Sequence, residues 1–168
     1  VGKNETQAAR VAKLLIVAGS QSREISISQS APVLVVPEGL SYSPESPDAD
    51  QPLTITFKAS SRSALYGYTG DVYVHIGVVN EGAWLFVPAE WNENIAKCKM
   101  TVSGSNVWSI TLSPTVREWF GSGTTPVNQL GIVVRSADGS KKGIEEDSFV
   151  QVTDSKYEGF VPGEIKEA

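Results

Sequence analysis

The chain has 168 residues, 40% of them hydrophobic, which is enough to bury the core of an ordinary domain without metals or disulfides. Its net charge of -5 argues against a nucleic-acid partner, because proteins that bind phosphate backbones present a basic patch. The single cysteine, Cys98, excludes an internal disulfide, and no apolar run reaches the length of a membrane-spanning helix.

The first predicted element is an antiparallel pair of strands within residues 1–31. Apolar side chains alternate along both halves of this segment on either side of a turn at Gly19: Ala12, Leu14, Ile16, Ile25 and Ile27. Prolines then interrupt residues 32–52, and proline cannot donate a ladder hydrogen bond. We therefore predict a crossing between domains there, with one short strand at 34–36. Because the chain opens at Val1 without a leader-like segment, we expect it to be a piece of a longer protein.

From Leu53 onward, short runs of alternating apolar and polar residues are separated by turns, which is the pattern of a β-sandwich. Strands are predicted at 53–58, 72–78, 83–87, 97–102, 107–112, 129–135 and 148–153. One helical turn is expected at 113–120, with Ser113 at its N-cap and Val116 facing Trp119 and Phe120. The predicted fold class is all-β: an antiparallel immunoglobulin-like β-sandwich over residues 32–155, preceded by a partial hairpin and followed by a linker at 156–168.

The candidate site lies on the strand at residues 71–77. Alternation places Tyr73 and the only histidine, His75, on one face, while valine and isoleucine side chains take the other face. Aromatic rings surrounded by polar groups suit a sugar, whose ring has an apolar face and a rim of hydroxyls. The candidate ligand-binding residues are Tyr73, His75, Trp84, Trp91 and Asn80.

Each of these residues also has a structural interpretation. His75 could hydrogen-bond a neighbouring backbone carbonyl, Tyr73 could pack across strands, and Trp84 could belong to the core. Trp91 could pack within its polar loop and Asn80 could be merely solvated. Trp108 is assigned to the core because it alternates in step with Ile110 and Leu112, and Trp119 because it lies on the apolar side of its helical turn.

No residue pattern indicates catalysis or metal binding. The carboxylates fall in predicted turns, and His75 with Cys98 supplies too few ligands for zinc. Neither a nucleophile-elbow motif nor a Walker-type lysine pattern occurs. We therefore expect no enzyme activity, metal or other cofactor in this chain, although a longer parent protein could carry a glycoside hydrolase domain.

The N-terminal residues carry a resemblance to a known module. The matching positions are Asn4 to Thr6, Arg10 to Ala12, Leu14 to Ile16, Gly19 and Ser26 to Gln29. This pattern resembles the second half of a BACON domain, an immunoglobulin-like module of Bacteroidetes polysaccharide-degrading proteins. The resemblance implies that residues 1–31 are the tail of a spacer domain, which would need sheet partners from elsewhere.

A second resemblance runs from about Val36 to Thr153. It is carried by 53–57, Tyr68 to Asp71, the strand 72–77 with histidine before glycine, Trp84, Trp91, Lys99, Met100, Trp108 and Arg135 to Gly139. This set is similar to the starch-binding modules of carbohydrate-binding families 25 and 26. The resemblance implies an exposed aromatic platform formed by Tyr73, His75 and Trp84. The chain departs from those families at 135–142, which contains no aromatic residue.

We therefore expect non-catalytic glycan binding, with starch or a maltooligosaccharide as the favoured ligand. The chain would be a monomeric module of a larger secreted or cell-surface polysaccharide-utilisation protein, at the outer-membrane surface of a Gram-negative bacterium. Any membrane contact would come through a lipoprotein anchor outside this segment. The alternative is a structural spacer or interaction domain. Exposed, coplanar rings at Tyr73, His75 and Trp84 would favour the binder, whereas buried or scattered rings would favour the spacer.

Overall fold

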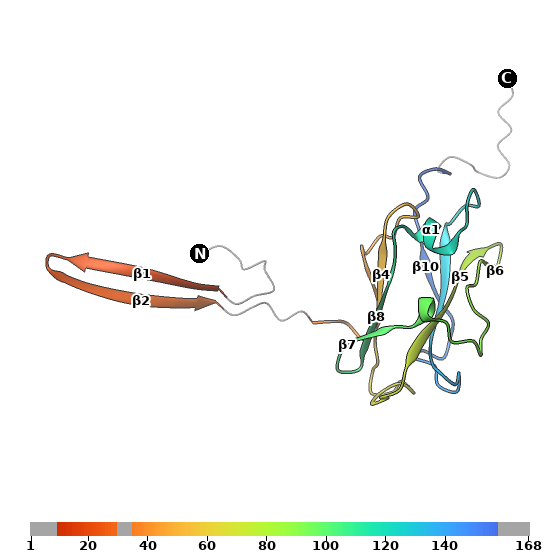
Figure 1. Ribbon diagram of the computed structural model, residues 1–168, viewed down its shortest axis with the longest axis horizontal. Coiled ribbons are helices and arrows are strands. Elements are labelled where there is room, and N and C mark those ends of the chain that lie inside the picture. Colours follow the sequence, from red (N-terminus) through yellow and green to blue (C-terminus); the bar gives the residue numbers. More distant parts are fainter. Residues whose placement is uncertain (1–9, 30–34, 158–168) are drawn as a thin grey trace, which may run out of the picture. The chain divides into compact units, whose positions relative to one another are not determined.

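The computed structural model describes residues 10–29 and 35–157 (Figure 1). The chain divides into two compact units, Val1–Val36 and Pro37–Ala168, so the division falls within the proline-rich stretch. In the described part of the first unit, β1 (Arg10–Ala18) and β2 (Gln21–Gln29) pair antiparallel. The two strands predicted here are confirmed, and Gly19 adopts a positive φ of 64° in the turn between them.

The hairpin has apolar side chains that are exposed to solvent. Leu14 pairs with Ile25 across the two strands, and both side chains are about half exposed. On the opposite face, Lys13 and Glu24 form an exposed ion pair at 2.7 Å. A two-stranded hairpin on its own is marginally stable in water, so this unit draws little stability from its own contacts.

The second unit contains two four-stranded antiparallel sheets, which form the two layers visible in Figure 1. The first has the order β3 (Gly39–Ser43), β4 (Leu53–Lys58), β8 (Val107–Leu112) and β7 (Thr101–Gly104). The second has the order β10 (Ser148–Gln151), β9 (Gln129–Ser136), β5 (Val72–Asn80) and β6 (Ala83–Leu85). The predicted all-β sandwich is confirmed.

The core lies between the inner faces of these sheets, as the alternation predicts. Along β4 the side chains of Leu53, Ile55 and Phe57 are buried, and the threonines between them are not. The ring of Phe57 stacks against Trp108 of β8 at a centroid distance of 6.2 Å. From the second sheet, β5 and β9 contribute buried valine, isoleucine and leucine side chains: Val72, Val74, Ile76, Val78, Leu130, Ile132 and Val134.

The helical turn also packs on the core. α1 (Val116–Phe120) buries Val116, Trp119 and Phe120, as predicted. Its N-cap is Thr115 and not Ser113, because the Thr115 side chain accepts a hydrogen bond from the Glu118 amide.

Several strand bounds differ from the sequence prediction. The short strand expected at 34–36 is not found at 35–36, and Leu34 lies outside the described residues; β3 follows instead. The strand expected at 97–102 begins as the 3₁₀ turn η1 (Ala96–Cys98), where the Cys98 amide bonds back to the Ile95 carbonyl. β6 ends at Leu85 because Phe86 turns the chain with a φ of 54°.

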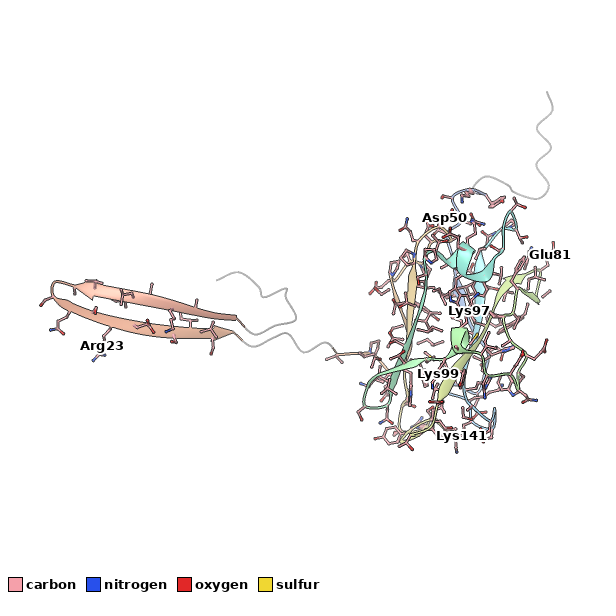
Figure 2. The ribbon with its side chains drawn as sticks, in the orientation of Figure 1. Arg23, Asp50, Glu81, Lys97, Lys99 and Lys141 are labelled. Atoms are coloured by element: carbon pink, nitrogen blue, oxygen red, sulfur yellow. The ribbon has the colours of Figure 1, made fainter. Side chains whose placement is uncertain are left out.

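One end of the sandwich is closed by an ion-pair network. Arg117 of α1 reaches Asp50 at 2.9 Å and Asp154 at 2.5 Å, and Lys156 also contacts Asp50 at 2.8 Å. Figure 2 shows Asp50 at the end of the unit where α1 lies. Tyr157 donates a hydrogen bond to the Thr124 carbonyl. The first two residues of the expected linker therefore contact the sandwich, and 158–168 lie outside the described residues.

Candidate binding site

The candidate site forms on the outer face of the sheet β10-β9-β5-β6. The register of β5 and β9 pairs Tyr73 with Arg135, His75 with Val133, and Gly77 with Gly131. Because Val72, Val74 and Ile76 point into the core, these alternate residues point outward. Phe149 of β10 is the partner of Gly131 on its other side and joins the same face.

Trp84 of β6 lies across the two paired glycines. A Cβ atom added at Gly131 would come within 2.7 Å of Cε2 of the Trp84 indole, and one added at Gly77 would come within 3.3 Å of its Cε3. The absence of side chains at both positions therefore leaves the space that the indole occupies. Trp84 itself is half-buried and does not enter the core.

The imidazole of His75 lies against the Trp84 indole. The two rings stack with a centroid distance of 5.7 Å and an interplanar angle of 22°. Trp91 stands beside His75 at 5.4 Å, with its ring turned by 70°. These three residues come from two adjacent strands and the loop that follows β6, and they surround one point on the sheet.

Burial lowers the pKa of His75 below its ordinary value, and the nearby positive charge of Arg135 acts in the same direction. Glu90, a hydrogen bond with the Ala89 backbone, and Asp147 oppose this shift more weakly. The imidazole is therefore neutral at pH 7, and it offers one hydrogen-bond donor and one acceptor.

A cavity of about 500 Å³ opens beside these rings. Its walls combine aromatic, small and charged residues: His75, Trp84, Trp91, Val133, Gly139, Lys142 and Asp147. The Lys142 ammonium lies 5.5 Å from the Trp91 ring centroid. The cavity therefore has an apolar surface for a ring and polar groups of both charges at its border.

Arg135 holds the loop that carries Trp91. Its side chain is buried, with 1% of its surface exposed, and donates from Nη1 to Asn94 Oδ1 at 2.9 Å and from Nη2 to the Glu93 carbonyl at 2.7 Å. The guanidinium also lies 5.7 Å from the Trp91 ring centroid. The position of Trp91 is thus tied to the sheet through Arg135, which is not among the five candidate binding residues.

Tyr73 does not join the exposed rings. It is on the predicted face, but only 8% of its surface is exposed and its ring belongs to the core cluster. The Arg135 guanidinium lies 5.5 Å from its ring centroid. The expectation of an exposed Tyr73 is therefore wrong, because its ring packs with the core cluster beside the Arg135 guanidinium.

Asn80 also lies apart from the other candidates. It is exposed at the end of β5, paired with Ala83, and it does not line the cavity. Glu81 and Gly82 form the turn that follows, and Figure 2 labels Glu81 at the tip of this hairpin. Of the five sequence candidates, the structure brings together His75, Trp84 and Trp91.

Sequence reasoning missed four contributors to this surface: Gly131, Lys142, Asp147 and Phe149. Phe149 is 51% exposed, and its ring meets Trp84 at a centroid distance of 6.2 Å and an angle of 71°. Its outward direction was readable from its alternation with Ser148 and Val150 in β10, but its neighbour across the sheet was not.

No protein-family model and no curated protein matches the chain. The function must therefore be inferred from the chemistry of the site. Within residues 10–29 and 35–157, no three histidine, cysteine, aspartate or glutamate side chains gather as a metal site requires. The described part of the chain also contains no helix with the length and apolarity needed to cross a membrane.

Proposed function

We propose that the outer face of the sheet β10-β9-β5-β6 binds a glycan without catalysis, and that the ligand is an α-glucan such as starch or a maltooligosaccharide. The observation that carries this proposal is the near-parallel, stacked pair of His75 and Trp84 beside a cavity of about 500 Å³. Such an arrangement combines an open apolar surface with a bounded space next to it.

The chemistry of a sugar matches these groups. The axial hydrogens of a glucose ring form an apolar face that can rest on the Trp84 indole, while its hydroxyls need donors and acceptors at the rim. The neutral imidazole of His75 supplies one of each. Lys142 and Asp147 add a donor and an acceptor at the border of the same cavity.

The shape of the surface favours an α-glucan over a straight β-glucan. Trp91 and Phe149 are turned by 70° and 71° from the rings that they contact, so the flat area is short and bounded. A straight, ribbon-like glucan would be matched by a long row of coplanar rings, whereas a curved chain fits a short surface with raised borders. The resemblance of strand 72–77 and Trp84 to starch-binding modules of families 25 and 26 supports the same ligand.

In this proposal the second unit is one module of a larger secreted or cell-surface protein, and residues 1–31 belong to a BACON-like spacer. Reversible adsorption would raise the effective concentration of the parent protein at an insoluble polymer. The module would act as a monomer, and a lipid anchor elsewhere in the parent would hold it at the surface of a Gram-negative cell.

A structural spacer is the competing function, and one observation favours it: Tyr73 and Arg135 show that part of this face serves packing. The two functions differ in what Trp84 does. In a spacer its half-exposed indole only covers two glycines, whereas in a binder it carries the ligand.

The test is a calorimetric titration with maltoheptaose, using cellohexaose as the ligand control. We expect saturable binding of maltoheptaose alone, and an affinity reduced by about tenfold or more in Trp84→Ala, because central aromatic contacts dominate such sites. Tyr66→Ala is the matched control, since Tyr66 is 55% exposed and outside the cavity. Unfolding curves establish that each variant is folded. Absence of binding, or equal affinity in Trp84→Ala, would leave the spacer function.

A further inference from the structure

The aromatic surface does not end at the cavity. Trp84 is contacted from two directions: by His75 along β5, and by Phe149 from β10 at the edge of the sheet. Phe149 does not line the cavity, yet half of its surface is exposed and it adjoins the half-buried Trp84. The apolar surface therefore continues past Trp84 in a direction that the cavity does not occupy.

The core does not require Phe149. Its neighbours Ser148 and Val150 are the β10 residues that point inward, and Phe149 is absent from the core cluster. An isolated exposed aromatic side chain is ordinary on a protein surface. Phe149 is not isolated, because its ring is perpendicular to the Trp84 indole and so forms a corner with it.

A sugar unit stacked on Trp84 would contact the Phe149 ring with its edge, or the next sugar unit of the same chain would contact that ring. The absence of a side chain at Gly131, the residue that pairs with Phe149, lets the Trp84 indole lie over β9 and reach the Phe149 ring. Edge strands are also reached easily by a polymer, since nothing in the sheet lies beyond them.

We propose that Phe149 forms a second sugar-contacting position, outside the cavity and next to the position over Trp84. The site would then hold at least two neighbouring units of an internal stretch of glucan chain and not a single end unit. This inference rests on the proposed function, and it adds a requirement for chain length to that function.

The experiment compares Phe149→Ala, Phe149→Tyr and Tyr66→Ala with the wild type, by calorimetry with glucose, maltotriose and maltoheptaose. In the wild type, affinity should rise from glucose to the longer sugars. In Phe149→Ala the affinity for maltotriose and maltoheptaose should fall by about fivefold, which corresponds to partial burial of one aromatic side chain, while the binding of glucose, a single unit, stays within about twofold. Phe149→Tyr keeps the ring and should match the wild type, as should Tyr66→Ala.

The possible failures are distinguishable. If the wild type binds maltoheptaose and Phe149→Ala binds it equally well, the second position does not exist although the proposed function stands. If Phe149→Ala loses affinity for glucose by the same factor as for maltoheptaose, Phe149 acts by supporting Trp84 and the inference is also wrong. If the wild type binds none of the three sugars, both proposals fall.

Discussion

The outer faces of the two sheets of the sandwich differ in the side chains that they carry. On the sheet β3-β4-β8-β7, two of the outward pairs between the central strands are hydroxylated, Thr54 with Thr111 and Thr56 with Ser109, and the side-chain oxygens of Thr54 and Thr111 lie 2.9 Å apart. On the sheet β10-β9-β5-β6, the outward positions hold paired glycines, aromatic rings and a buried arginine. Both sheets nevertheless bury the same kinds of aliphatic side chains inside.

This difference indicates that the fold alone does not require the aromatic face. Threonine and serine are sufficient to complete the outer side of the first sheet, and both fit a solvated strand. The second face instead carries features that cost stability: strand glycines and a buried guanidinium whose Nε has no hydrogen-bond partner among the described residues. The glycines leave the space that the Trp84 indole occupies, and Arg135 holds the loop that carries Trp91, so both features serve the arrangement of the aromatic rings.

Substitution of Arg135 should give the largest difference in stability between variants of the two faces. Arg135→Leu would leave the Asn94 side chain and the Glu93 carbonyl without their donor, so we expect the free energy of unfolding to fall by about 3 kcal/mol. The matched variant on the other face is Thr56→Ala, which should change it by about 0.5 kcal/mol or less.

Urea denaturation measures both variants, and the fluorescence of Trp91 should change in Arg135→Leu because the loop loses its anchor. A loss similar to that in Thr56→Ala would show that Arg135 does not hold this end of the face.

Substitution of the strand glycines should give an intermediate difference in stability between variants of the two faces. Gly131→Ala would place a methyl group 2.7 Å from Cε2 of Trp84, so we expect a loss of about 1–2 kcal/mol in stability together with weaker maltoheptaose binding. Gly104→Ala in β7 is the control, because its Cβ would meet Val107 at an ordinary 3.5 Å. Thermal unfolding and calorimetry measure the two effects. Equal behaviour of the two variants would contradict the placement of the indole on Gly131.

The smallest difference should appear in the pH dependence of binding. The pKa of His75 lies below its ordinary value of 6.5 because of burial, and a neutral glucan lying on the imidazole would lower it further. Protonation therefore opposes binding: affinity should be constant above about pH 6.5 and fall a few-fold toward about pH 5. Folding stability contributed by His75 follows the same sign, being present above pH 6.5 and lost as the pH falls.

A His75→Gln variant provides the control for this pH effect, because it should bind more weakly but without the dependence. Asp138, near Trp91, does not contribute in this range, since hydrogen bonds from Ser136 and Ser140 lower its pKa to about 2. Constant wild-type affinity between about pH 7.5 and pH 5 would mean that the ligand does not cover His75.

Local alternation made the strands and part of the site predictable. The strand at 107–112 matches β8, and alternation placed His75 on the outer face. Contacts between distant segments could not be foreseen. The burial of Tyr73 involves Arg135 on the neighbouring strand, and the position of Trp84 depends on the register between Gly77 and Gly131. The contact of Phe149 with the site also depends on register, because β10 pairs Phe149 with Gly131 of β9.

The most direct test of glucan binding at this face uses the proton NMR signals of His75, because the chain contains one histidine and its imidazole signals need no assignment. Titration with maltoheptaose at about pH 7.5 should move these signals saturably, and titration with cellohexaose should not. Signals that stay in place while maltoheptaose is added to saturating concentration would contradict the account, since any glucan on Trp84 would lie against the stacked imidazole.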